Sequence, residues 1–160
     1  MIDIRRDILP LKDMMYRLAL RITQNSQEAE DVVQDVIIKL WNTRGSLENI
    51  TNLEAYAMRM VRNMALDRQR MRANHTESLE AACDKAQQDD DTIERRERLD
   101  NIRAVMAQLP EKQRTAMHLR DFEGRSYKDI AEVMGITEDQ VKVNIFRARQ
   151  FVKAKLAAFM

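Results

Sequence analysis

The sequence predicts an all-α protein in which two small helical domains are joined by a flexible acidic linker. Of its 160 residues only three are glycine and two are proline, whereas 44% are hydrophobic and 33% are charged. This composition favours long helices over sheets with many turns. Apolar residues recur at helical spacing along most of the chain, but this periodicity fails over 73–92, where six carboxylates accompany a single Lys85. We therefore expect a first domain over 1–72, a linker over 73–92 and a second domain over 93–160.

Two helices are expected to open the first domain. Residues 11–21 predict the first, because apolar side chains recur there at helical spacing. Asn25 with Glu28 is a capping pair, which indicates a second helix over 27–42. Its buried stripe should be Ala29, Val33, Val36 and Leu40, and its opposite side Asp31, Gln34, Asp35, Ile38 and Asn42, with Trp41 nearby. A solvated face explains the polar residues, whereas large apolar groups beside carboxylates are typical of a partner surface, and both interpretations stay open.

A third helix is predicted over 53–72, after a loop that contains Gly45. The apolar positions that should dock it on the preceding helices are Leu53, Ala57, Met60, Val61 and Met64. Its remaining surface is strongly basic, with Tyr56 and Asn63 among Arg59, Arg62, Arg68, Arg70 and Arg72. Such arginines fit either a solvated surface or, beside a DNA-binding motif, a track for nucleic acid.

The second domain should begin near Ile93 with a helix that buries Leu99, Ile102, Val105, Met106 and Leu109. Pro110 suits the first turn of the next helix, which is expected to end at Gly124. Ser126 with Asp129 opens a short helix that stops at Gly135 and buries Ile130, Ala131 and Met134. Thr137 with Gln140 opens the last helix, whose core stripe is Val141, Ile145, Ala148 and Val152. The three-residue break predicts a helix-turn-helix of the winged-helix-like DNA-binding class.

The outward face of this last helix is unusual for a solvated surface. Val143 and Phe146 lie opposite the core stripe, flanked by Asp139, Gln140, Lys142 and Arg147. Thymine methyl groups would supply apolar contacts, while the amide and the cations can read base edges or hold phosphates. The alternative is a structural three-helix domain in which Phe146 packs on a neighbouring helix.

Composition excludes several classes of protein. The net charge of +1 gives no global positive field, so any nucleic-acid binding must come from local clusters. Cys83 is the only cysteine, and no apolar run reaches the roughly 20 residues of a membrane span, so a cytoplasmic protein is expected. His75 and His118 stand far apart without a carboxylate cluster, and no nucleophile has a recognisable base. We expect no metal, cofactor, catalytic residue or enzymatic activity.

Three segments together resemble a known family. They are AEDVVQDVIIKLW over 29–41, AYAMRMVRNMALDRQR over 55–70 and LPEKQRTAMHLRDFEGRSYKDIAEVMGITEDQVKVNIFRAR over 109–149, with the acidic linker between the last two. In this order and spacing, which spans nearly the whole chain, they are similar to the extracytoplasmic-function sigma factors, small specificity subunits of bacterial RNA polymerase.

The resemblance implies three interfaces. The polymerase face, which docks on the clamp coiled coil of the largest polymerase subunit, would consist of Asp31, Gln34, Asp35, Ile38 and Trp41. The minus-ten face, which recognises and opens promoter DNA beside the loop over 43–52, would contain Tyr56, Arg59, Arg62, Asn63 and Arg68. The minus-thirty-five face, which reads duplex DNA, would contain Thr137, Gln140, Lys142, Val143, Phe146, Arg147 and Arg149. The linker would pass near the active centre of the polymerase.

The partners implied by the resemblance are core RNA polymerase, promoter DNA and a membrane-associated anti-sigma factor, with no small-molecule substrate. Two departures limit the transfer. Val143 and Asn144 stand where many relatives have a small hydroxyl residue and an arginine, and Asp35 stands where glutamate is common. The promoter sequence therefore cannot be copied from relatives. A stand-alone helix-turn-helix regulator is the competing class, and it would not need the polymerase face.

Overall fold

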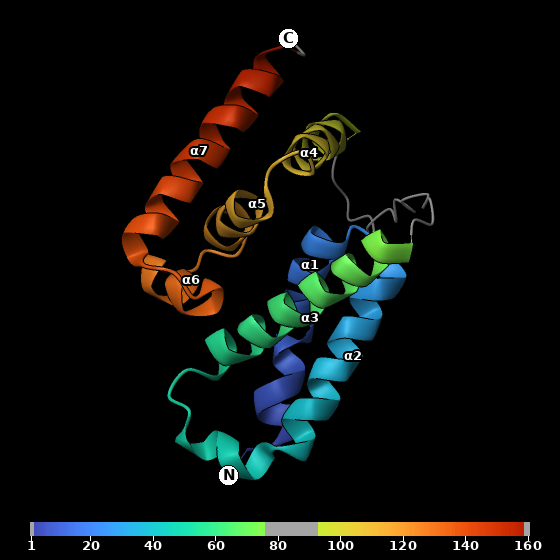
Figure 1. The fold of residues 1–160 in the computed structure, drawn as a ribbon, viewed down its shortest axis with the longest axis vertical. Helices are drawn as coiled ribbons and strands as arrows, with labels where there is room; N and C mark the ends of the chain where they lie inside the picture. Colours follow the sequence, from blue (N-terminus) through green and yellow to red (C-terminus); the bar gives the residue numbers. More distant parts are fainter. Residues whose placement is uncertain (1, 76–92, 159–160) are drawn as a thin grey trace.

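The structure, a computed structural model, describes residues 2–75 and 93–158, and these residues contain helices and turns but no strand. This confirms the all-α prediction (Figure 1). The first group of elements is η1 (Ile4–Ile8), η2 (Leu9–Leu11), α1 (Lys12–Thr23), α2 (Ser26–Asn42), η3 (Arg44–Asn49) and α3 (Leu53–His75). The second is α4 (Ile93–Met106), α5 (Glu111–Met117), η4 (His118–Phe122), α6 (Tyr127–Met134) and α7 (Glu138–Ala157). No helix in the described part is long and apolar enough to cross a membrane.

The first domain is a bundle in which α1, α2 and α3 contact one another. The Asn25 side chain accepts a hydrogen bond from the Glu28 backbone N–H at 2.9 Å, so α2 begins where the capping pair predicts. The expected stripes are confirmed, because every predicted stripe position of the first two helices is buried, namely Leu11, Met14, Met15, Leu18, Ile22, Ala29, Val33, Val36 and Leu40. These side chains carry the hydrophobic stabilisation of the bundle.

The second domain contains the predicted helix-turn-helix. Ser126 caps α6, and the chain leaves α6 at Gly135, whose φ of 69° is a left-handed conformation that favours glycine. Thr137 and Gln140 then form a reciprocal capping box at the start of α7. All four expected core residues of α7, Val141, Ile145, Ala148 and Val152, are buried, and the packed helices contain no β-wing among the described residues.

Several boundaries differ from the sequence prediction. Helix α3 continues to His75, three residues beyond its expected end, so the predicted linker loses 73–75 and the rest of it, 76–92, lies outside the described residues. Pro110 caps α5 instead of entering its first turn, and the helix expected to reach Gly124 ends earlier, giving way to the π-type turn η4. In α6 the buried set includes Val133, whereas Ala131 is only half-buried. Short-range caps were predicted better than the lengths of helices.

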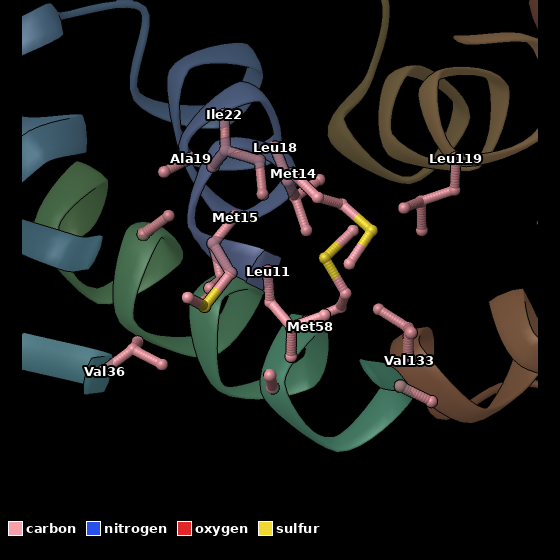
Figure 2. Packing of buried hydrophobic residues seen from close by; sticks show 14 of the residues in the cluster. Leu11, Met14, Met15, Leu18, Ala19, Ile22, Val36, Met58, Leu119 and Val133 are labelled. Atoms are coloured by element: carbon pink, nitrogen blue, oxygen red, sulfur yellow. The ribbon is translucent and has the colours of Figure 1, made fainter. Parts of the chain in front are cut away.

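The two domains share one hydrophobic core. Helix α6 packs on α3, and α1 contacts α5 and η4 (Figure 1). Figure 2 shows Met14 and Met58 between the first domain and the side chains of Leu119 and Val133 from the second. Since all four side chains are at most 6% exposed, the contact between the domains is itself part of the buried interior. The sequence did not predict this contact.

Candidate nucleic-acid interface

The first turn of α7 is fixed by its capping box. The Gln140 backbone N–H donates to the Thr137 hydroxyl at 3.1 Å, and the Thr137 N–H donates to Oε1 of Gln140 at 3.0 Å. These two predicted DNA-contacting residues therefore already use one oxygen each inside the protein. The amide nitrogen of Gln140 is left as the group with which this side chain can read a base edge.

The outward face of α7 carries exposed apolar side chains. Phe146 is 60% exposed and Val143 is 44% exposed, so neither packs on a neighbouring helix of the described protein. This excludes the interpretation in which Phe146 belongs to a structural core. Asp139, Lys142 and Arg147 are exposed beside them, which places apolar groups and cations on one accessible face. Arg149 is different, because its guanidinium pairs with Asp121, and this ion pair raises the pKa of Arg149.

The minus-ten face is divided by the fold. Tyr56, Arg59 and Asn63 are exposed and follow one stripe of α3. Arg68 instead points to α2, with nitrogens 3.5 Å from Asp31 and 3.3 Å from Asp35. Arg62 is only 8% exposed. The strongly basic surface expected on α3 is therefore interrupted, since carboxylates and a carbonyl of other helices hold Arg62 and Arg68.

A groove lies beside the loop that precedes α3. Its volume is about 470 Å³, and it is lined by Ile2, Arg6, Asp7, Leu47, Glu48, Ile50, Thr51 and Leu53. The lining combines apolar residues with the cationic Arg6, the acidic Asp7 and Glu48, and the hydroxyl-bearing Thr51. Such a surface can accept a flat, hydrogen-bonding group such as an unstacked base.

The polymerase face stays accessible on α2. Asp31, Gln34 and Asp35 are exposed, as are Ile38 at 57% and Trp41 at 39%. The guanidinium of Arg44 stacks 3.7 Å above the Trp41 ring and donates to the Trp41 carbonyl at 2.8 Å. Sequence reasoning missed Arg44, although its position three residues after an exposed tryptophan is a signal for cation–π contact.

A second set of polar residues missed by sequence reasoning joins the two domains. Arg17 donates to both oxygens of Glu123, at 2.7 and 3.0 Å, and Nε2 of His118 lies 3.3 Å from the same carboxylate. Burial raises the pKa of Glu123, but the hydrogen bonds from Arg17 and the nearby imidazole of His118 outweigh it and lower the pKa to about 2. Burial lowers the pKa of His118, whose Nδ1 accepts from Arg21 at 3.2 Å.

Burial also lowers the pKa of Arg21 to about 10, with Arg103 and Arg114 adding like charge. No sequence signal identifies these contacts, because Arg17 and Arg21 of the first domain are about a hundred positions from Glu123 and His118 of the second. Within the described residues, no group of three or more His, Cys, Asp or Glu side chains is arranged to hold a metal ion.

Comparison with known proteins accounts for both domains. The family description "Sigma-70 region 2" matches residues 8–75, and "Sigma-70, region 4" matches residues 99–152. The RNA polymerase sigma-H factor of Pseudomonas aeruginosa is 37% identical over an alignment that covers 94% of this chain and 85% of that protein. The extracytoplasmic-function (ECF) sigma factor SigE of Mycolicibacterium smegmatis is 31% identical, with 91% of this chain and 58% of that protein covered. The chain belongs to the ECF sigma factors.

In this sigma factor, region 2 therefore contains α1 to α3 and region 4 contains the helix-turn-helix of α6 and α7. The fold agrees with a solved structure, the sigma factor RpoE of Bartonella quintana in complex with the anti-sigma factor NepR. Its TM-score is 0.83 at 24% identity, with 97% of each chain covered. A stand-alone regulator is not favoured, because the relatives match over region 2 as well as the helix-turn-helix.

Proposed function

We propose that this sigma factor binds core RNA polymerase through the polymerase face of α2 and directs it to promoters. Region 2, with α3 and the loop before it, would recognise and open the minus-ten element. Region 4 would read the minus-thirty-five element with α7. The two regions correspond to the predicted domains over 1–72 and 93–160, joined by 73–92, with α3 extending the first domain to His75.

The exposed face of α2 is the observation that carries this proposal. Ile38 and Trp41 are 57% and 39% exposed beside Asp31 and Asp35, whereas the apolar residues on the opposite side of the same helix are buried. A regulator that acts without polymerase has no use for such a surface. Aromatic and aliphatic groups ringed by charge are typical of a protein interface.

The face of α7 supports sequence reading. Val143 and Phe146 would contact thymine methyl groups, while Arg147, Lys142 and the amide nitrogen of Gln140 supply donors for base edges and phosphates. Arg149 and the Thr137 hydroxyl would contribute indirectly, because internal contacts already engage both. The capping box would hold the first turn of α7 rigid against the DNA.

Region 2 supports strand opening in a different way. Tyr56 offers a ring for stacking on an unpaired base, and Arg59 and Asn63 offer donors along the same stripe of α3. The groove between η1 and the η3 loop offers a place for a base that leaves the stack. Arg62 and Arg68 would reach DNA only after they release their internal partners.

The family also suggests a regulatory partner. Because the Bartonella quintana relative was solved with the anti-sigma factor NepR, we propose that an anti-sigma factor holds this chain as well. Its association with a membrane stays a prediction. We place the protein in the cytoplasm, where polymerase and promoter DNA are found, and assign it no enzymatic activity of its own.

Transcription in a purified system tests the proposal. Core polymerase is combined with this protein and a library of upstream sequences from its genome. Discrete transcripts that depend on both proteins are expected. If the protein binds DNA fragments but neither binds core polymerase nor yields transcripts, the stand-alone regulator is the correct function.

A further inference from the structure

All three nitrogens of the Arg62 guanidinium are engaged by partners inside the protein. Its Nε and Nη2 donate to the two oxygens of Glu111, each at 2.8 Å, and its Nη1 donates to the backbone carbonyl of Met134 at 3.3 Å. The residue is 8% exposed. This two-pronged contact is the one that an arginine also makes with a phosphate. The carboxylate of Glu111 thus uses the two donors with which Arg62 could bind a phosphate.

Glu111 is held ready for this contact by its own helix. It is the first residue of α5, and the Thr115 hydroxyl one turn later donates to its Oε2 at 2.7 Å. Burial raises the pKa of Glu111, but the hydrogen bonds from Arg62 and Thr115 outweigh it and lower the pKa. The carboxylate is therefore ionised at neutral pH, and the contact is a charged pair between region 4 and region 2.

The surroundings of this pair belong to both regions. Met58 of α3 packs toward Leu119 and Val133 in the shared core (Figure 2). Asn52, just before α3, donates to Asp129 of α6 at 2.9 Å. Gly135, in the turn of the helix-turn-helix, is close enough to Arg59 that an added Cβ would lie 4.0 Å from its guanidinium. A DNA strand that followed α3 to Arg62 would collide with α6 and this turn.

The contact between Arg62 and Glu111 leaves the other proposed interfaces of the chain exposed. The polymerase face of α2 and the apolar residues Val143 and Phe146 of α7 are exposed while Arg62 is buried. Arg62 is thus hidden in a chain whose other proposed interface residues, including Tyr56, Arg59 and Asn63 of the same helix, remain accessible.

We propose that this structure is a self-inhibited state, in which Glu111 competes with promoter DNA for Arg62 and keeps region 4 closed over α3. The proposal rests on the proposed function, since it takes Arg62 to be a DNA-contacting residue. When region 4 moves away from α3, Arg62 releases the Glu111 carboxylate and binds a phosphate of the melted strand instead.

Three single variants of the full chain test this proposal. Glu111→Gln removes the competing charge with little change in shape, Arg62→Gln removes the other member of the pair, and Glu132→Gln neutralises an exposed carboxylate of α6 as the matched control. Circular dichroism verifies that each variant is folded. Small-angle X-ray scattering then measures whether the domains separate, and fluorescence anisotropy measures binding of a single-stranded oligodeoxynucleotide of random sequence over a series of salt concentrations.

The expected results differ for each variant. Glu111→Gln should increase the radius of gyration and bind the oligonucleotide more tightly, with a salt slope steeper by about one because one more phosphate is contacted. Arg62→Gln should increase the radius of gyration without any gain in affinity. Glu132→Gln should match the wild type in both measurements. Exchanging the two residues, Arg62→Glu with Glu111→Arg, should restore the compact scattering.

Two outcomes overturn the proposal. Scattering of Glu111→Gln and Arg62→Gln identical to the wild type would mean that the pair does not hold the chain closed. Opening of Glu111→Gln without tighter DNA binding would mean that DNA and Glu111 do not compete for Arg62. Failure of the proposed function is seen separately, as absence of promoter-directed transcription by the wild type and by Glu111→Gln alike.

Discussion

Neutralising Asp35 should separate polymerase binding from folding. Asp35 is on the exposed side of α2, and its only described ion pair is with Arg68, 3.3 Å away, where the side chains of Asp35 and Arg68 are 53% and 33% exposed. A lysine at this position would repel Arg68, so charge reversal would perturb the fold as well as the interface. Asp35→Asn removes the carboxylate charge without that repulsion.

The two expected free energies differ in size. An exposed ion pair contributes about 0.2 to 1 kcal/mol, so Asp35→Asn should lower the free energy of unfolding by no more than that amount. Loss of one charge from a desolvated interfacial pair costs about 2 kcal/mol or more, which is about a 30-fold weaker Kd for core polymerase. Helicity and thermal unfolding should therefore remain close to the wild type while the Kd for core polymerase rises about 30-fold or more.

Arg68→Gln is the matched control for this experiment. It removes the ion pair with Asp35, and also the one with Asp31, but keeps both carboxylates, so core binding should persist with a loss of stability at least as large as that of Asp35→Asn. Titration of labelled core polymerase with each variant gives the Kd, and thermal unfolding gives the stability. Equal core binding by the wild type and Asp35→Asn would refute the assignment of α2 to the polymerase.

Two further predictions concern α7 and the contact between regions. Replacing thymine by uracil in the upstream element should weaken binding by the wild type, but should scarcely affect a Val143→Ala, Phe146→Ala variant, whose stability should be unchanged because both side chains are exposed. Uracil bound as well as thymine by the wild type would contradict apolar base reading. Acid should weaken the packing of region 4 on region 2, because the pKa of His118 is lowered from its ordinary value of 6.5. The folded protein therefore favours the neutral imidazole, so the contribution of His118 to the free energy of unfolding is complete above about pH 6.5 and is lost as the pH falls. His118→Gln, whose amide has an acceptor and a donor but does not titrate, should flatten this dependence below pH 6.5, by at most about 1.4 kcal/mol per pH unit. An unchanged slope in thermal unfolding would rule His118 out.

The parts of the fold that the sequence predicted are those determined by nearby residues. Asn25 with Glu28, Ser126 with Asp129 and Thr137 with Gln140 each act over three positions, and all three begin helices where expected. The core stripes of α2 and α7 were also predicted, because helical periodicity is a local property. Such signals specify each helix but not which helices of different domains touch.

The candidate site was predicted less completely for the same reason. Arg62 and Arg68 follow the basic pattern of α3, but Glu111 is 49 positions from Arg62, and Asp35 is 33 positions from Arg68. No periodicity links a cation to a carboxylate at such separations. His118 similarly gave no signal, because its burial depends on Arg21 and Glu123, which come from opposite domains. The exposed pair of Val143 and Phe146, by contrast, was predicted from the single helix that carries it.

The pairing of Arg62 with Glu111 bears on the order in which the sigma factor binds polymerase and DNA. In the closed chain, α2 presents Asp31, Asp35 and Ile38 at the surface, so core polymerase can dock before the domains separate. In the proposed closed state, a DNA strand would reach Arg62 only after Glu111 and α6 have left α3. A net charge of +1 gives the closed protein little general attraction for DNA. The proposed closure therefore predicts that polymerase binding precedes strand capture, because the proposed polymerase face is exposed while Arg62 is still paired with Glu111.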